Sequence, residues 1–196
     1  MNFIFDVGNV LLEFSPESFL GGLFSDTELV NTMNRVIFKS EEWEKLDQGV
    51  LTHAQATDIF CAREPNFETA IHLTMQNLKS MMPPMPETIT LLPKVKAAGH
   101  KLYYLSNYHK EIRDYVVREH SFWELFDGGV FSCDIHVTKP SPRIYHHLLD
   151  TYNLTPGDCV FFDDVEENVA AACDVGIHGV LFTGAECVKA FISAGE

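Results

Sequence analysis

Four short segments of this 196-residue sequence contain residue types that can do chemistry, and the first holds Asp6. Asp6 closes an apolar run and is followed by Val7 and Gly8, so its carboxylate lies beside a glycine turn whose backbone amides can face an anion. The same pattern is typical of an aspartate that caps a turn and a glycine that supplies an unusual backbone angle. Asp6 by itself therefore supports both a catalytic and a structural interpretation.

A second segment contains the adjacent acids Asp163 and Asp164, which follow the apolar run Cys159–Phe162. Two neighbouring carboxylates repel each other and are stabilised by a cation between or beside them. Oxygen ligands of this kind suit Mg²⁺. The alternative is that the pair caps and charges the first turn of the following helix, where acids are also favoured.

Two further segments offer hydrogen-bond donors to an anion. Ser106 and Asn107 end another apolar run, where a hydroxyl and an amide can donate to phosphate oxygens. Both residue types are also common where a strand gives way to a helix. Lys139 precedes Pro140, and an ammonium held there can neutralise phosphate charge. A lone lysine is more often a solvated surface charge.

The elements that must position these residues alternate along the chain. Five apolar runs, each followed by a helical pattern, are typical of buried parallel strands. They are Phe3–Val7, Leu102–Leu105, Gly129–Phe131, Cys159–Phe162 and Gly179–Phe182. Pro86 is placed to open a helix that Gly99 ends, and Pro142 is placed to open another helix. We therefore predict an α/β fold, a doubly wound, Rossmann-like parallel sheet with right-handed crossovers.

One long stretch interrupts this alternation with helical patterns only. Between the first strand and Pro86 the sequence indicates four or five helices, with capping boxes at Ser25–Glu28 and Thr52–Gln55. The proline-rich run Met81–Pro86 is expected to lead back as a stiff linker.

This stretch divides the chain into two predicted domains. Residues 1–14 and 83–196 form the α/β hydrolase core, and residues 15–82 form an inserted α-helical cap. Ligands of open α/β sheets bind at the carboxyl ends of the strands, and the insertion leaves the first strand at that end. We therefore expect the cap to cover the site and to keep out large substrates.

Charge, composition and cysteine usage exclude several classes of protein. The chain has 14 basic and 28 acidic residues, and its formal net charge of −14 disfavours non-specific binding to nucleic acid or anionic membrane. Hydrophobic residues make up 46%, which excludes a disordered chain. The five cysteines are widely spaced and form no C-x-x-C pattern, which predicts reduced thiols. We also find no basic leader and no long apolar run, and we therefore expect a cytoplasmic protein. We expect a monomer or a weak dimer.

Together the four segments resemble, in order and spacing, the motifs of the haloacid dehalogenase-like hydrolase superfamily. Those motifs are an aspartate after the first strand, a serine or threonine after the second, a lysine, and an acidic pair. The helical insertion is similar to the small helical cap of that superfamily, so the resemblance covers the whole chain. Phe5–Val10, Leu105–Asn107 and Lys139–Tyr145 look closest to the branch of glucose-1-phosphate phosphatases. The phosphatase-like domain of bifunctional epoxide hydrolases is a more distant likeness.

The resemblance implies a role for each matching residue. Asp6 would be the nucleophile that forms an aspartyl-phosphate, and Lys139 would be catalytic with it. The implied ligands of Mg²⁺ are Asp6, Gly8 through its backbone carbonyl, Asp164, and Asp163 directly or through water. The implied phosphate-binding residues are Ser106, the Asn107 amide and Lys139.

The implied function is a Mg²⁺-dependent phosphatase of small phosphorylated metabolites, with sugar phosphates such as glucose 1-phosphate as the expected substrates. One alternative is a dehalogenase-type or other carbon-centre hydrolase that uses the same aspartate. Haloacid dehalogenases need no metal, so the intact pair of Asp163 and Asp164 argues against that alternative. Another alternative is a catalytically decayed protein that only binds phosphorylated metabolites.

One position departs from the superfamily pattern. Its phosphatases carry a second aspartate, the general acid and base, two residues after the nucleophile, and here that position is Gly8. The leaving group can be one that needs little protonation, such as the anomeric hydroxyl of a sugar 1-phosphate. Alternatively, another group such as His109, Tyr108 or Glu13 takes over the proton transfer, or the reaction is not phosphate hydrolysis. The sequence leaves these three explanations open.

Overall fold

A five-stranded parallel sheet organises the chain in the computed structural model, which describes residues 1–193. The strands are β1 (Asn2–Phe5), β2 (Lys101–Ser106), β3 (Gly128–Phe131), β4 (Cys159–Asp163) and β5 (His178–Leu181). Their order is β3-β2-β1-β4-β5, and all neighbours run parallel. The central strand β1 thus ends beside β2 and β4, and the predicted doubly wound sheet is confirmed.

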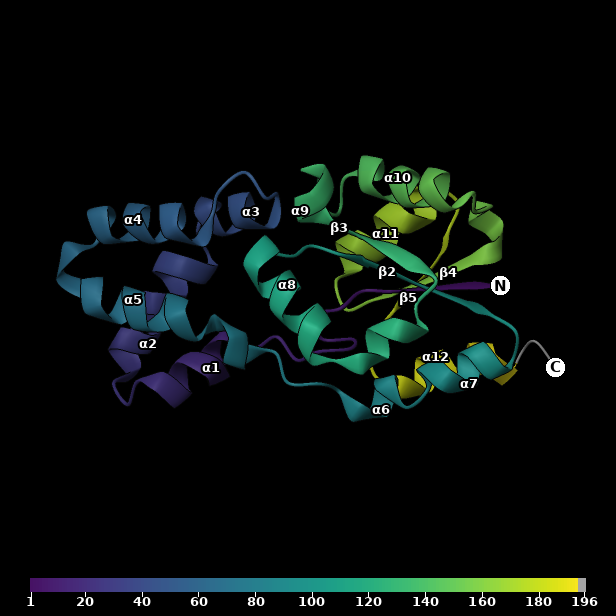
Figure 1. Cartoon of the computed structure of the whole chain (residues 1–196), viewed down its shortest axis with the longest axis horizontal. Helices are drawn as coiled ribbons and strands as arrows, with labels where there is room; N and C mark the ends of the chain where they lie inside the picture. Colours follow the sequence, from purple (N-terminus) through teal and green to yellow (C-terminus); the bar gives the residue numbers. More distant parts are fainter. Residues whose placement is uncertain (194–196) are drawn as a thin grey trace.

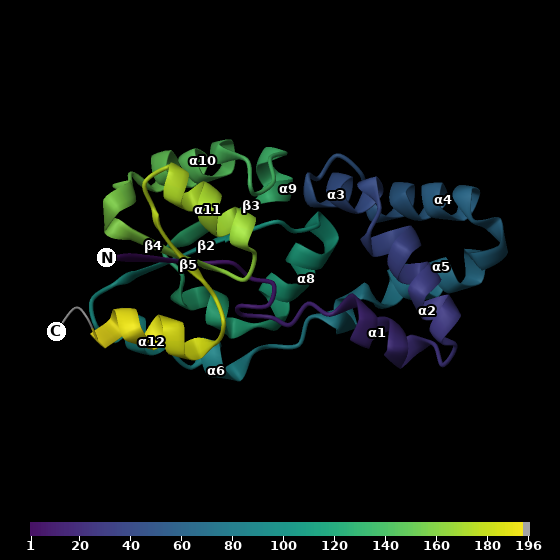
Figure 2. The same ribbon diagram turned by 180° about the vertical axis from the view of Figure 1, so that it is seen from behind.

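Helices cover both faces of this sheet (Figures 1 and 2). One face carries α10 (Pro142–Tyr152) and α11 (Glu166–Asp174), and the other carries α6 (Pro86–Ile89), α7 (Leu92–Ala97), α8 (Lys110–Glu119) and α12 (Ala185–Ser193). Side chains of a strand alternate between the faces, so Ile4 packs in the core under α10 whereas Phe3 and Phe5 pack in the opposite core. A Phe162 ring from β4 stacks on Phe5 at 5.2 Å between centroids. The sheet is therefore buried on both sides, which explains its continuous apolar strands.

Two predicted boundaries are wrong, each for a local reason. The first strand ends at Phe5 and not at Val7, because the Val7 carbonyl accepts the N–H groups of Leu11 and Leu12 in a turn. A single helix from Pro86 to Gly99 is replaced by α6 and α7. Pro93 lies in the first turn of α7, and its missing N–H prevents a continuous helix.

Between β1 and β2 the chain forms the helical insertion, which we define as Pro16–Met81. Its elements are α1 (Pro16–Leu23), α2 (Thr27–Met33), the π-helix η1 (Asn34–Phe38), α3 (Glu41–Asp47), α4 (His53–Arg63), α5 (Glu68–Asn77) and the 3₁₀ turns η2 (Pro65–Phe67) and η3 (Leu78–Met81). Thr52 and Gln55 make the predicted reciprocal capping box of α4. The capping box predicted at Ser25 is wrong, since Asp26 caps α2 by accepting from the N–H of Glu28 at 2.8 Å.

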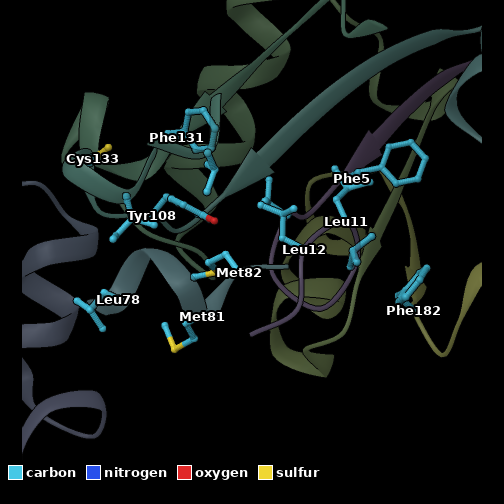
Figure 3. Close-up of a cluster of buried hydrophobic side chains, with 14 of the residues drawn as sticks. Phe5, Leu11, Leu12, Leu78, Met81, Met82, Tyr108, Phe131, Cys133 and Phe182 are labelled. Carbon is cyan, nitrogen blue, oxygen red and sulfur yellow. The ribbon is translucent and has the colours of Figure 1, made fainter. Parts of the chain in front are cut away.

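The two chain segments that join the insertion to the sheet lie side by side. The N–H of Glu13 donates to the carbonyl of Pro83, and the N–H of Met85 donates to that of Leu11, both at 2.8 Å. Figure 3 shows Met82 from the returning segment beside Leu12 from the outgoing one, within one buried cluster. Both segments leave the sheet at the carboxyl end of its strands, so the insertion lies beyond that edge (Figure 1).

A second contact holds the insertion against the core near α9 (Ser132–Ile135). The Ser132 hydroxyl donates to the backbone carbonyl of Asp47 at the end of α3 and accepts from the N–H of Tyr108 at 2.9 Å. Gly49 packs directly on the backbone of Cys133. The end of α3 and the turn after it are therefore docked on α9, which follows β3.

Neither a membrane-spanning helix nor a disulfide occurs in residues 1–193. No helix there is both long and apolar enough to cross a bilayer. All five cysteines are free, and Cys133 and Cys159 are buried in the core.

The docking of α3 predicts a strong effect of substituting Gly49. Gly49 has φ +66°, and a Cβ there would lie 2.5 Å from the carbonyl oxygen of Cys133. We expect Gly49→Val to lower the free energy of unfolding by about 1–3 kcal/mol, measured by urea denaturation.

The matched control is Gly22→Ala in α1, where a Cβ meets no atom within 4 Å. This variant should be as stable as the wild type or more stable by about 0.5–1 kcal/mol, because alanine favours a helix. Equal stability of Gly49→Val and the wild type would contradict the docked arrangement.

Candidate active site

Asp6 lies immediately after β1, at the centre of the carboxyl edge of the sheet. Its side chain is 11% exposed. Three groups converge on its Oδ1 atom: the N–H of Val7 at 2.6 Å, the hydroxyl of Ser106 at 2.6 Å and the ammonium of Lys139 at 2.9 Å. Because these contacts all fall on Oδ1, the carboxylate is held in one orientation and Oδ2 is left for other partners.

Lys139 is buried between two carboxylates. Its Nζ lies 2.9 Å from Asp6 and 2.6 Å from Oδ2 of Asp163, and its side chain is only 2% exposed. The backbone of Lys139 is also fixed, since its N–H donates to Oδ1 of Asn107 at 2.8 Å and its carbonyl accepts from Nδ2 of Asn107 at 3.0 Å. Lys139 is therefore buried and held in place at this edge of the sheet, and it is not the solvated surface charge that a lone lysine usually is.

The adjacent acids Asp163 and Asp164 lie in different environments. Asp163 is fully buried, and besides Lys139 it accepts from the N–H of Val165 at 2.8 Å and from Nδ2 of Asn168 at 3.1 Å. Asp164 lines the cavity and accepts from Nδ2 of Asn9 at 2.9 Å. Asp163 is thus held by hydrogen bonds within the protein, whereas Asp164 faces the cavity above Asp6.

Burial and charge shift the ionisation of this group of residues. Burial raises the pKa of Asp6 to about 6, with Lys139 opposing the shift and Asp163 adding to it. Burial alone would lower the pKa of Lys139, but the charges of Asp6 and Asp163 outweigh it, so the pKa of the ammonium lies above its usual value. Lys139 therefore stays charged at neutral pH and favours the ionised form of Asp6.

The three carboxylates can hold a metal ion. Oxygen atoms of Asp6, Asp163 and Asp164 all lie within 4.8 Å of one another. The backbone of Gly8 borders the same cavity. An all-oxygen donor set of this kind suits a hard cation such as Mg²⁺, which prefers carboxylate, carbonyl and water ligands. The donor set therefore fits the ion that the sequence predicts.

A cavity of about 200 Å³ lies over Asp6 between the sheet edge and the insertion. Ser106, Asn107 and Lys139 line it together with Asp6. Its apolar walls are Phe14, Trp43, Met81, Met82, Ile112 and Val165. The predicted phosphate-binding residues therefore all border this cavity, and so do the predicted metal ligands except Asp163, which is fully buried.

Trp43 serves both the packing of the insertion and the cavity wall. Its ring packs on Phe38 at 4.5 Å and on Phe14 at 6.1 Å between centroids. It also meets the His109 ring edge-on at 4.1 Å.

Several side chains of the site were not found from the sequence. Asn9 and Asn168 orient the two acids, and Asp47 reaches the cavity from the insertion. A signal existed for Asn168, which lies in the first helical turns after the acidic pair. No local signal marks Asp47. Glu13, proposed as a substitute acid, is exposed and does not border the cavity, whereas Tyr108 and His109 both border it.

Comparison with known proteins agrees with this geometry. A family model described as haloacid dehalogenase-like hydrolase matches residues 1–176. The sesquiterpene phosphatase astK of Aspergillus oryzae is 27% identical over 180 residues, which cover 92% of this chain and 88% of that protein. The mouse bifunctional epoxide hydrolase 2 is 41% identical over 56 residues, 29% of this chain and 10% of that protein.

Solved structures show the same fold. An aspartate-to-alanine mutant of the HAD family enzyme bt-2542 from Bacteroides thetaiotaomicron, in complex with magnesium and inorganic phosphate, superposes with a TM-score of 0.71 at 20% identity, covering 90% of each chain. At this identity the likeness establishes the fold alone.

The buried lysine predicts an unusual pH dependence of stability in a variant that lacks it. Lys139→Met leaves Asp6 and Asp163 buried without their cation, and breaking such a group typically costs about 3–5 kcal/mol at neutral pH. Loss of the ammonium also removes the charge that lowers the pKa of Asp6. Because the folded-state pKa then lies further above the unfolded value of 3.8, protonation stabilises the folded variant, and its deficit should shrink as the pH falls from 7 to 5.

Urea denaturation at pH 7 and pH 5, without added divalent ions, measures this effect. Lys94→Met, at an exposed position of α7, is the control and should match the wild type at both pH values. A deficit of Lys139→Met that is the same at both values would contradict the assignment.

Proposed function

The chain belongs to the haloacid dehalogenase-like hydrolase family, and on this basis we propose that it is a Mg²⁺-dependent phosphatase of small phosphate monoesters. The observation that carries this function is the orientation of Asp6. Its Oδ1 is held by Ser106, Lys139 and a backbone N–H, and the side chain borders a cavity lined by further groups that can meet a dianion. A carboxylate fixed in this way is suited to in-line attack on phosphorus.

Each residue has a defined part in the proposed reaction. Asp6 attacks through Oδ2, the P–O bond to the leaving group breaks, and water later hydrolyses the aspartyl-phosphate. Lys139 and the Ser106 hydroxyl lie within hydrogen-bond distance of Asp6 and would contact the equatorial oxygens, where transition-state charge accumulates. The side-chain amide of Asn107 is engaged with the backbone of Lys139, so we assign its phosphoryl contact to the backbone N–H.

For the metal we propose Asp6, Asp164 and the Gly8 carbonyl as direct ligands. Asp163 already accepts hydrogen bonds from Lys139, Val165 and Asn168, so we place it behind the ion, in contact through water. A bound Mg²⁺ would neutralise phosphoryl charge and reduce its repulsion with Asp6. This local compensation matters in a chain with a formal net charge of −14.

We further propose that residues 15–82 act as a cap over the core of residues 1–14 and 83–196. The cavity is formed from both parts, with Trp43 and Met81 supplied by the insertion and Asp6 by the core. A cavity of about 200 Å³ admits a small metabolite, and phosphorylated proteins and nucleic acids are too large to enter it.

Two classes of leaving group fit this cavity. Sugar phosphates such as glucose 1-phosphate are supported by polar groups above Asp6, among them Asp47 and His109. Apolar phosphate esters are supported by the aromatic and methionine walls, and astK, a relative over 92% of this chain, is a sesquiterpene phosphatase. A hydrolase that attacks carbon in place of phosphorus has less support, because such chemistry does not need the cluster of three carboxylates.

The first test is phosphate release from glucose 1-phosphate, a terpenyl monophosphate and p-nitrophenyl phosphate, with Mg²⁺ and with EDTA. We expect release to require Mg²⁺, and Asp6→Asn to lower kcat by about 10³-fold or more because the nucleophile is lost. The substrate with the highest kcat/KM identifies the class of leaving group.

Asp174→Asn, an exposed aspartate at the end of α11, is the matched control and should retain full activity. Activity that survives both EDTA and Asp6→Asn would overturn the function. Activity that survives EDTA but requires Asp6, measured with a 2-haloacid as substrate, would favour the carbon-centre hydrolase.

A further inference from the structure

His109 has an unusual position in the cavity over Asp6. It follows the phosphate-binding segment after β2, caps the start of α8, and is only 3% exposed. Its Nε2 atom is buried and makes no hydrogen bond within the described residues. A buried polar atom without a partner is costly and rare in folded proteins, and at the wall of a cavity it indicates a group awaiting a ligand.

Two residues of the insertion hold the His109 ring. Nε2 of His53 lies 3.2 Å from Nδ1 of His109, which fixes one side of the ring. Oδ1 of Asp47 lies 3.2 Å from Nε2 of His109. This contact lies within ion-pair distance but lacks hydrogen-bond geometry, so the hydrogen-bonding capacity of Nε2 is left for a ligand.

His53 is suited to orient His109 and not to compete with it for a proton. Burial, followed by the neighbouring His109, lowers the pKa of His53 to about 4, although Glu111 opposes the shift. His53 is therefore neutral near pH 7. The edge-on contact of Trp43 completes the enclosure of His109.

The chain lacks the aspartate at position 8 that would protonate the leaving group, because that residue is Gly8. Of the three substitutes that the sequence suggests, Glu13 lies outside the cavity. Tyr108 borders the cavity, but burial, with the charges of Asp6 and Asp47, raises the pKa of its hydroxyl far above neutrality. The Tyr108 hydroxyl, which like Nε2 of His109 makes no hydrogen bond within the described residues, therefore holds its proton too tightly to act as a general acid near neutral pH. His109 is the remaining candidate.

We propose that His109 is the general acid and base of this enzyme and that Asp47 and His53 of the insertion position it. Since this role presupposes the phosphatase function, it concerns the same reaction at Asp6. In the first step Oδ2 of Asp6 bonds to phosphorus, the ester P–O bond breaks with its electron pair on the leaving oxygen, and protonated His109 gives its Nε2 proton to that oxygen. In the second step neutral His109 takes a proton from the attacking water, whose oxygen bonds to phosphorus while Asp6 leaves as a carboxylate.

This arrangement ties proton transfer to the docking of the insertion. His109 belongs to the core, but Asp47 and His53 come from α3 and α4. The acid is therefore oriented only when the insertion lies against the core, as it does through Ser132 and the backbone of Asp47. An open insertion would leave Asp6 exposed to water without a positioned proton donor.

The experiment compares kcat/KM of wild type and His109→Gln on phosphate esters whose leaving groups differ in acidity. The quantity kcat/KM reports the first step. A nitrophenol can leave in that step without being protonated, whereas an aliphatic alcohol needs a proton in order to leave. For His109→Gln we expect a loss of about 10²–10⁴-fold on an alkyl phosphate and only a few-fold change on p-nitrophenyl phosphate. We also expect a burst of nitrophenol, because the second step loses its base.

Asp47→Asn is the test of positioning and should show the same selective loss to a smaller extent. His147→Gln, an exposed histidine of α10, is the matched control and should be unchanged on both esters. Equal losses of His109→Gln on the two esters would indicate a structural role and overturn the inference. A wild type that hydrolyses neither ester in an Asp6-dependent manner would overturn the phosphatase function itself, and the role of His109 with it.

Discussion

The site depends on one constraint, which is that two carboxylates from neighbouring strands are buried at the same sheet edge. Asp6 follows β1 and Asp163 ends β4, and their mutual repulsion in a poorly hydrated environment requires a cation. Lys139 supplies it with short contacts to both. The surrounding residues maintain this triad, since Asn107 fixes the backbone of the lysine and Asn168 fixes Asp163. The same charges would also receive the dianionic phosphate ester that we propose as substrate.

Chemistry and selectivity are divided between the two parts of the chain. The groups that would act on phosphorus lie on the loops after the strands, where the sheet holds them rigidly. Much of the apolar cavity wall comes from the insertion and its returning segment, including Trp43, Met81 and Met82. A change of substrate can therefore arise in the insertion without disturbing Asp6 and Lys139. The paired segments at Leu11 and Met85 connect the two parts at one place, close to the nucleophile.

The replacement of a carboxylate by Gly8 alters how proton transfer can be controlled. An aspartate on the nucleophile loop would be in place whether or not the insertion is docked. His109 depends on Asp47 and His53, which are contributed by the insertion. The proposed role of His109 would therefore couple proton transfer to the docking of the insertion on the core.

The sequence by itself determined the sheet and the polar residues at its carboxyl edge. Apolar runs that end in Asp6, Ser106 and Asp163 predict a shared site because the carboxyl ends of parallel strands meet at one edge. Tertiary structure alone decided the rest. Asp163 and Asp164 are neighbours in sequence, yet one is fully buried and the other faces the cavity, because successive side chains point in different directions where β4 ends. His53 and His109 are 56 residues apart, and their contact follows from how the insertion docks on the core. No local periodicity or capping signal encodes that docking, since it arises from complementary surfaces that exist only once both parts have folded.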